Sequence, residues 1–301
     1  GVQTCALPIF ADRAQFIPYP YCFRCPYNMK VETCDTYCHK EFEKLFDTEY
    51  QSVWDEKVGQ CEFGAFYIEP MQGTGGYIVP PKGYMKKLAE SLKKRNVLLV
   101  ADEIQMGVYR TGKLWSWENF DIIPDIFVFG KAITNGLNPL SGIWAKEELI
   151  NPQKFPPGST HSTFASNPLG TSLALEVLKM SSEDDFEKKV NERGAYFLKR
   201  IQELKSRWKV VGDVSGLGLA LRIELCEKDG FTASRKLADR MFNEGLKGDI
   251  KIGDKTYGLV LDIGGYEKNV ITLAPSLLIS EAEIDLGIQL FEALLKRCGA
   301  E

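Results

Sequence analysis

The stretch VLLVADEIQMGVYRTGKLWSWENFDIIPDIFVFGK, residues 97–131, decides the fold class. Two short apolar runs inside it, VLLVA (97–101) and DIFVFG (125–130), are typical of buried parallel strands. Asp102 follows the first run and Lys131 follows the second. Because ligands of open α/β sheets collect at the carboxyl ends of the strands, we expect this acid and this amine to lie at a ligand site.

The chemistry of this pair indicates a particular cofactor. A carboxylate can keep a pyridine nitrogen protonated, and a lysine can hold an aldehyde as a Schiff base. Pyridoxal 5′-phosphate carries both groups. An isolated Asp102 and Lys131 would more often form a surface ion pair between two strand ends, so the interpretation depends on the surrounding sequence.

Further motifs follow one another along the chain. They are IEPMQGTGGYIVPPKGYM (68–85), ADEIQMGVYRTGKLWSWENF (101–120), HSTFASNP (161–168), GLGLALRIEL (216–225) and NVITLAPSLLISEAEID (269–285). In this order they resemble the class III pyridoxal-phosphate-dependent aminotransferases, the family of 4-aminobutyrate and ornithine aminotransferases. The resemblance runs from about Phe16 to the C-terminus and implies a fold-type I enzyme.

The resemblance also implies roles for five residues. Lys131 would form the Schiff base and move the proton, and Asp102 would hold the ring nitrogen. Ile104 would pack on the ring, and Gln105 would lie near the phenolic oxygen. Thr163 would reach the phosphate of the neighbouring subunit, which requires a homodimer or a higher homo-oligomer. From the residues alone, Ile104 could equally be a core residue, and Thr163 could belong to a turn or a helix cap.

The substrate residues depart from the family pattern. Glu69 matches a glutamate at the substrate mouth that typically pairs with an arginine binding the substrate carboxylate. Thr272 stands where that arginine is expected, and Ser276 replaces the second proline of the same motif. A threonine cannot offer the bidentate charged fork of an arginine. The sequence therefore does not identify the amino acceptor.

We interpret the chain as an aminotransferase (EC 2.6.1.-) that moves an amino group from an amino acid or ω-amine to a 2-oxo acid. One alternative on the same scaffold is an amino-acid racemase, an epimerase or a decarboxylating transaminase. Another is an inactive, truncated fragment. Class III enzymes carry a phosphate-binding loop and an aromatic residue that stacks on the cofactor upstream of the segment matched here, and residues 11–60 contain no such loop.

Composition excludes several other classes. The 301 residues are 44% hydrophobic and 26% charged, as in ordinary globular proteins. The net charge of −4 gives no basic surface for nucleic acid, and no apolar run is long enough to cross a membrane. GVQTCALPIF, residues 1–10, lacks the charged start of a signal peptide, and we interpret it as an artefactual leader. We expect a cytoplasmic protein.

The pattern predicts two domains. Residues 11–207 would form a partial, cofactor-binding α/β domain with a mostly parallel sheet, and residues 208–301 a smaller α+β domain. Within them we expect a loop over 18–38, a helical segment over 39–57 and strands over 63–70 and 140–145. Further predicted elements are helices over 80–95, 167–180, 183–207, 231–247 and 280–297, with strands over 209–226, 256–265 and 269–275.

Four of the eight cysteines lie close together in PYCFRCPYNMKVETCDTYC. Cys22, Cys25, Cys34 and Cys38 could form a zinc or disulfide cluster, for which His39 is the only other soft ligand nearby. An intracellular enzyme would normally keep such thiols reduced. We favour a loop without a metal.

Overall fold

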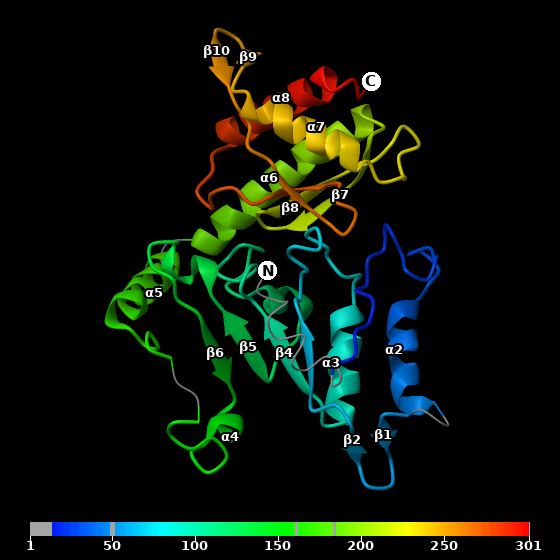
Figure 1. Cartoon of the computed structure of the whole chain (residues 1–301), viewed down its shortest axis with the longest axis vertical. Helices are drawn as coiled ribbons and strands as arrows, with labels where there is room; N and C mark the ends of the chain where they lie inside the picture. The colour runs from blue at the N-terminus through cyan, green and yellow to red at the C-terminus, as the bar shows by residue number, and fades with distance from the viewer. Residues whose placement is uncertain (1–13, 49–51, 160–161, 183–184, 301) are drawn as a thin grey trace.

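The computed structural model describes residues 14–48, 52–159, 162–182 and 185–300. Two lobes are visible, each built on its own four-stranded sheet (Figure 1). Helix α6 (Phe186–Arg207) runs from the edge of the lower lobe into the upper lobe. In the described part of the chain, no helix is both long and apolar enough to span a membrane.

The sheet of the first lobe has the strand order β3-β4-β5-β6. Its first three strands are parallel, and β6 runs antiparallel to β5. Asp102 pairs with Val128, so the predicted pair of neighbouring parallel strands is confirmed. The strands are β3 (Ala65–Ile68), β4 (Leu98–Asp102), β5 (Ile126–Phe129) and β6 (Gly142–Ala145).

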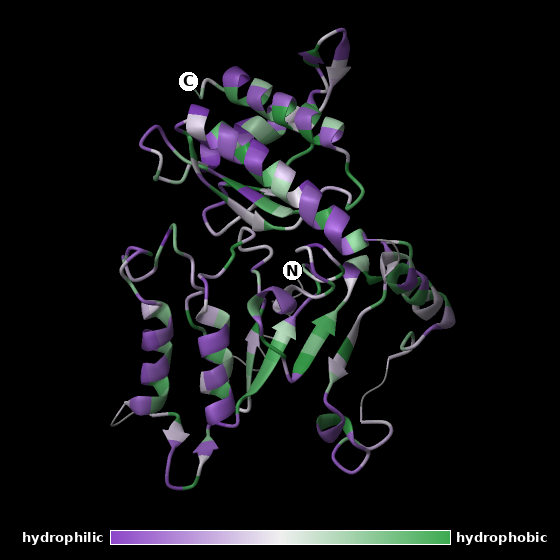
Figure 2. Cartoon of the chain, turned by 180° about the vertical axis from the view of Figure 1, so that it is seen from behind, coloured by the Kyte–Doolittle hydropathy of each residue, from purple (hydrophilic) through white to green (hydrophobic). Residues whose placement is uncertain are grey.

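Burial of the central strands fixes this sheet. Figure 2 shows the central strands among the most hydrophobic segments of the chain (Figure 2). Helices α2 (Tyr37–Asp47) and α3 (Tyr84–Lys94) pack beside each other, with Phe42 and Leu88 buried in one core. Burial of such a side chain contributes about 1.5–3 kcal/mol, so the apolar spacing of both helices determines which face meets the sheet.

The prediction of a helical segment over 39–57 is wrong for residues 52–57, and residues 49–51 lie outside the described part of the chain. A short hairpin of β1 (Trp54–Asp55) and β2 (Gln60–Cys61) follows instead. The Ser52 hydroxyl accepts a hydrogen bond from the backbone of Trp54 at 3.1 Å, and Asp55 accepts one from Lys57 at 2.9 Å. Such bonds between side chain and neighbouring backbone compete with the helix.

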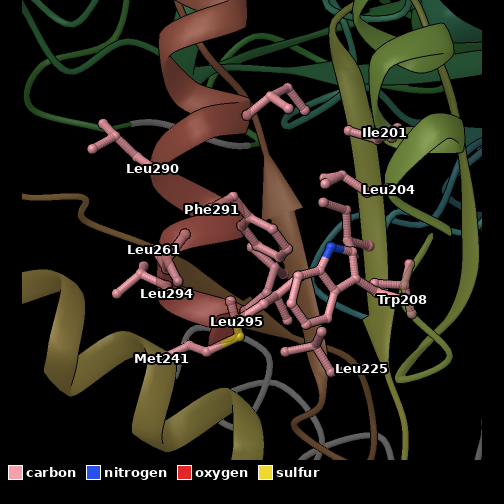
Figure 3. Packing of buried hydrophobic residues seen from close by; sticks show 14 of the residues in the cluster. Ile201, Leu204, Trp208, Leu225, Met241, Leu261, Leu290, Phe291, Leu294 and Leu295 are labelled. Atoms are coloured by element: carbon pink, nitrogen blue, oxygen red, sulfur yellow. The ribbon is translucent and has the colours of Figure 1, made fainter. Parts of the chain in front are cut away.

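The second lobe is an antiparallel sheet covered by helices; this agrees with the predicted α+β organisation. Its strand order is β11-β12-β8-β7, and Figure 3 shows side chains such as Leu204, Trp208 and Phe291 packed together in its core (Figure 3). The elements are β7 (Val211–Leu217), β8 (Ala220–Leu225), α7 (Arg235–Leu246), β9 (Ile250–Ile252), β10 (Lys255–Tyr257), β11 (Asp262–Gly264), β12 (Val270–Leu273) and α8 (Glu281–Arg297).

Helix α6 supplies Ile201 and Leu204 to the core of the second lobe. The division of the chain at residue 208 stays a prediction. The remaining elements join the two lobes or flank the first sheet: they are η2 (Ser116–Phe120), η3 (Lys131–Thr134), α4 (Glu147–Ile150) and α5 (Pro168–Ser182).

Candidate functional site

Asp102 is the last residue of β4, at the carboxyl edge of the first sheet. Its Oδ1 accepts a hydrogen bond from the backbone N–H of Ile104 at 3.0 Å, which turns the chain away from the strand. Within the described ranges, Oδ2 has no hydrogen-bond partner. This half-buried carboxylate can therefore accept one further hydrogen bond.

Lys131 follows β5 at the same edge and opens η3. Its side chain is exposed, and its backbone has a φ of 44°, in the left-handed region. Holding a non-glycine residue there costs about 1–2 kcal/mol, and such strain is concentrated at functional sites. Lys131 lines an open cavity of about 480 Å³ together with Thr134, Gly136, Asn138, Pro139, Leu140 and Ser141.

Glu69 follows β3 and completes a row of three charged groups from three neighbouring strands. Its Oε2 accepts a hydrogen bond from the N–H of Gly73 at 2.7 Å. Burial raises the pKa of Glu69, the Gly73 hydrogen bond lowers it, and the charge of Asp102 raises it further. The positive charge of Lys131 also lowers this pKa. The structure thus brings Glu69, Asp102 and Lys131 within electrostatic reach of one another.

Gln105 lies against the glycine-rich loop that follows Glu69. A Cβ added at Gly73 would stand 2.9 Å from Cδ of Gln105 and 2.9 Å from Oε2 of Glu69. Nε2 of Gln105 donates to the hydroxyl of Tyr77 at 3.4 Å. The sequence interpretation did not single out Gly73 or Tyr77, although both belong to the glycine-rich turn QGTGGY that signals a close backbone approach.

Two further residues support this region and were not predicted. The hydroxyl of Tyr19 lies 3.0 Å from the backbone oxygens of both Glu69 and Pro70 and donates to them. Nη1 of Arg110 donates to the backbone oxygens of Leu219 at 3.1 Å and Pro275 at 2.7 Å. Arg110 therefore joins the first lobe to the segment after β12.

Ile104 and Thr163 differ in how close they come to the Asp102–Lys131 pair. Cγ2 of Ile104 lies 3.7 Å from the position of a Cβ on Gly130, between the two strand ends. Thr163 is exposed in a turn before α5, and no described contact joins it to Asp102 or Lys131. Its neighbour His161 lies outside the described residues. The cofactor roles of Ile104 and Thr163 stay predictions.

Thr272 is only 5% exposed, on β12. It pairs in register with Asp262 of β11, and its hydroxyl donates to the Asp262 carboxylate. On the other side of β12, Thr272 pairs with Arg222 of β8. The position at which the resemblance implies a carboxylate-binding arginine therefore holds a threonine that is bonded to a carboxylate.

Glu103 is a buried carboxyl beside the site. Burial raises its pKa to about 7, although hydrogen bonds from Ser116 and Trp117 lower it. The N–H and hydroxyl of Ser116 each donate to it at 2.7 Å, and the N–H of Trp117 donates at 3.0 Å. These bonds fix the start of η2, so we assign Glu103 a structural role.

The four clustered cysteines line one cavity with Pro20, Met29 and Pro81. Their thiols are free, and burial raises the pKa of Cys22 to about 11. Over residues 14–48, 52–159, 162–182 and 185–300, no three His, Cys, Asp or Glu side chains are placed to hold a metal ion. Our expectation of a loop without a metal stays a prediction.

Comparison with known proteins gives the same family as the site. The model of the family Aminotransferase class-III matches residues 5–295. A leucine/methionine racemase of Thermococcus litoralis is 31% identical over 92% of this chain and 58% of its own length. An ornithine aminotransferase of Exiguobacterium sp. is 36% identical over 77% of this chain and 52% of its own length.

A solved structure shows the same fold. The (S)-enantioselective ω-transaminase from Thermomicrobium roseum superposes with a TM-score of 0.79 and 26% identity, over 99% of this chain and 65% of that protein. The chain belongs to the class III aminotransferase family, whose members use pyridoxal 5′-phosphate. It spans between about one half and three fifths of the length of the two relatives named above.

Proposed function

We propose that the protein is a pyridoxal-phosphate-dependent aminotransferase that moves an amino group from an amino acid or ω-amine to a 2-oxo acid. The observation that carries this proposal is the row of Glu69, Asp102 and Lys131 along one sheet edge. The aminotransferases of the same family support this type of reaction. The acid and the amine at the sheet edge are the residue types that the cofactor requires.

The residues fit the cofactor. Oδ2 of Asp102 is open to the N–H of a pyridine ring, and the exposed amine of Lys131 is open to its aldehyde. In this proposal Ile104 would pack on the ring, and the amide of Gln105 would lie near the phenolic oxygen. When bound, the cofactor supplies an electron sink for the bond that breaks at the substrate carbon.

Three side chains of this protein would then have separate roles in the reaction. Nζ of Lys131 would remove the proton from the substrate Cα and deliver it to the carbon of the cofactor's aldehyde group, so that the amino group stays on the cofactor. The Asp102 carboxylate would accept the hydrogen bond of the ring N–H and favour the protonated ring, which is a Coulombic task that an amide cannot perform. Glu69, held by Gly73, faces the substrate beside Lys131.

We further propose that the working unit is a cytoplasmic homodimer or larger homo-oligomer. Support comes from Thr163, whose exposed position before α5 suits a phosphate held by the partner subunit. From the turn before α5, the hydroxyl of Thr163 would donate to that phosphate.

A racemase on the same scaffold is the second candidate. The similarity to the Thermococcus litoralis racemase and the threonine at position 272 favour it. The two reactions can be distinguished by supplying an L-amino acid without any oxo acid. A racemase then forms the D-amino acid, whereas an aminotransferase stops after transferring one amino group to the cofactor.

The primary test uses the chain mixed with pyridoxal 5′-phosphate. A visible absorbance band of protein-bound cofactor that is absent in Lys131→Ala, and retained in the control Lys251→Ala on the exposed β9–β10 hairpin, supports the proposal. An unchanged band in Lys131→Ala rejects Lys131 as the residue that holds the cofactor.

A further inference from the structure

We propose that Tyr19 is a positioning residue for the reaction: it holds the backbone of Glu69, so that the Glu69 carboxylate keeps one orientation at the sheet edge. This inference rests on the proposed aminotransferase function and adds a residue to its site. Three observations carry it: the bonds of the Tyr19 hydroxyl, a second restraint at Gly73, and the anchorage of the segment that contains Tyr19.

The hydroxyl of Tyr19 lies 3.0 Å from the backbone oxygens of Glu69 and Pro70, which are 50 and 51 residues further along the chain. Within the described ranges, neither oxygen accepts another hydrogen bond. Burial raises the pKa of Tyr19, and the charge of Glu69 raises it further, so the hydroxyl stays protonated and donates. Since carbonyl oxygens removed from water need a donor, this hydroxyl fixes the main chain directly after β3.

Gly73 supplies a second restraint on the same turn. Its N–H donates to Oε2 of Glu69 at 2.7 Å, so the Glu69 carboxylate folds back over the turn that follows it. Tyr19 therefore holds the main chain of Glu69, and Gly73 holds its carboxylate. Because both restraints act on one turn of five residues, loss of the first should weaken the second.

Tyr19 is itself anchored on two sides. Its ring packs against the buried core of the first lobe that contains Ile68. Two residues further on, the hydroxyl of Tyr21 donates to the carboxylate of Glu224 on β8, and Arg24 pairs with the same carboxylate. The Tyr19 hydroxyl thus belongs to a segment that contacts both lobes, which limits the positions it can take.

Tyr19→Phe removes this hydroxyl and keeps the ring that packs in the core. The matched control is Tyr84→Phe, because Tyr84 is 1% exposed in the same core cluster. Within the described part of the chain, the hydroxyl of Tyr84 bonds to neither Glu69 nor Pro70. Both variants lose one oxygen atom, and only Tyr19→Phe loses the bonds to the turn.

The first readout is hydrogen exchange of the Gly73 amide in the chain without cofactor, measured by mass spectrometry at single-residue resolution. We expect Tyr19→Phe to speed this exchange about fivefold, as for the loss of one ordinary hydrogen bond. Tyr84→Phe should speed it less than about twofold. The internal reference is the Leu99 amide, which donates to the Asp125 carboxylate at 2.8 Å and should keep its rate.

The second readout asks whether Tyr19 acts through Glu69. Cofactor absorbance follows the amino-donor half-reaction, which needs no acceptor, with L-alanine, L-lysine and butan-1-amine as probe donors. We expect Tyr19→Phe to raise KM about fivefold and to change kcat less than about twofold, because Glu69 would meet the substrate in the ground state and the transition state alike. When Glu69→Gln is already present, adding Tyr19→Phe should change KM less than about twofold.

Two results overturn the inference. One is exchange at Gly73 that is unchanged in Tyr19→Phe, or that rises equally at Gly73 and Leu99. The other is a full rise of KM on adding Tyr19→Phe to Glu69→Gln, since Tyr19 would then act independently of Glu69. Absence of reaction of the unaltered chain with all three donors overturns the proposed function instead, and exchange at Gly73 still tests whether Tyr19 holds the turn.

Discussion

Gly73 separates Glu69 from Gln105, and a single methyl group there tests whether this spacing matters. In Gly73→Ala, the new Cβ would stand 2.9 Å from Cδ of Gln105 and 2.9 Å from Oε2 of Glu69, and closer still to the Gln105 amide oxygen. Ordinary van der Waals contact begins at 3.4 Å. Both side chains must therefore move by at least 0.5 Å (3.4 − 2.9).

Movement of the side chains is the expected response, because both contacts are the ends of flexible groups. Gln105 would then lose its hydrogen bond to Tyr77, and Glu69 would weaken its bond to Gly73. Each lost bond costs about 1 kcal/mol, so we expect kcat/KM for the amino-donor half-reaction to fall about 10- to 30-fold. The free energy of unfolding should fall by no more than about 2 kcal/mol.

Stopped-flow absorbance of the cofactor measures the half-reaction, and urea denaturation measures stability. The matched control is Gly287→Ala on α8, where an added Cβ meets nothing within 4 Å; it should raise stability by up to ~1 kcal/mol through helix propensity and leave the kinetics unchanged. Unaltered kinetics in Gly73→Ala would refute the claim that Gly73 sets the positions of Glu69 and Gln105.

Two further predictions concern buried charge. Arg24→Ala removes one ion-pair partner of Glu224, whose side chain is 1% exposed. Because Arg222 still pairs with this carboxylate, the change should destabilise by about 1.5 kcal/mol in urea unfolding, the cost of one hydrogen bond to a charged group. The exposed pair broken by Arg235→Ala should cost less than about 0.5 kcal/mol. The pKa of Glu103 is raised by burial to about 7 from an ordinary 4.5, so the folded state binds its proton more tightly, and stability falls as pH rises from 4.5 to 7. The loss of stability is about 3 kcal/mol for a pKa shift of this size. Glu103→Gln should therefore flatten the pH–stability curve between pH 4.5 and 7. An equally steep curve in this variant would contradict the raised pKa of Glu103.

The sheet edge could be predicted because its signal is local. An apolar run followed by one charged residue defines both the strand and its end, and parallel neighbours place those ends together. Asp102 and Lys131 follow from this rule. Glu69 was predicted as a site residue from the family resemblance. The strand before it was predicted from its apolar run.

The rest of the site depends on contacts between distant segments. Tyr77 and Asp262 are 185 residues apart (262 − 77), and their proximity requires the second lobe to lie against the glycine-rich loop of the first. Thr272 was predicted as a substrate residue, but its bond to Asp262 depends on the register of β11 against β12. No periodicity in VLDIGGYEKNVITL fixes that register, since the intervening turn determines it.

The predicted cofactor residues and Thr272 lie on different lobes. Asp102 and Lys131 belong to the parallel sheet, whereas Asp262 and Thr272 belong to the antiparallel one. A substitution on β11 or β12 should therefore leave the strand ends that carry Asp102 and Lys131 in place. Arg110 limits this independence, because its bonds to Leu219 and Pro275 join the segment after β4 to the β7–β8 turn and to the segment after β12. A change that displaced Arg110 should therefore disturb the contact between the two lobes.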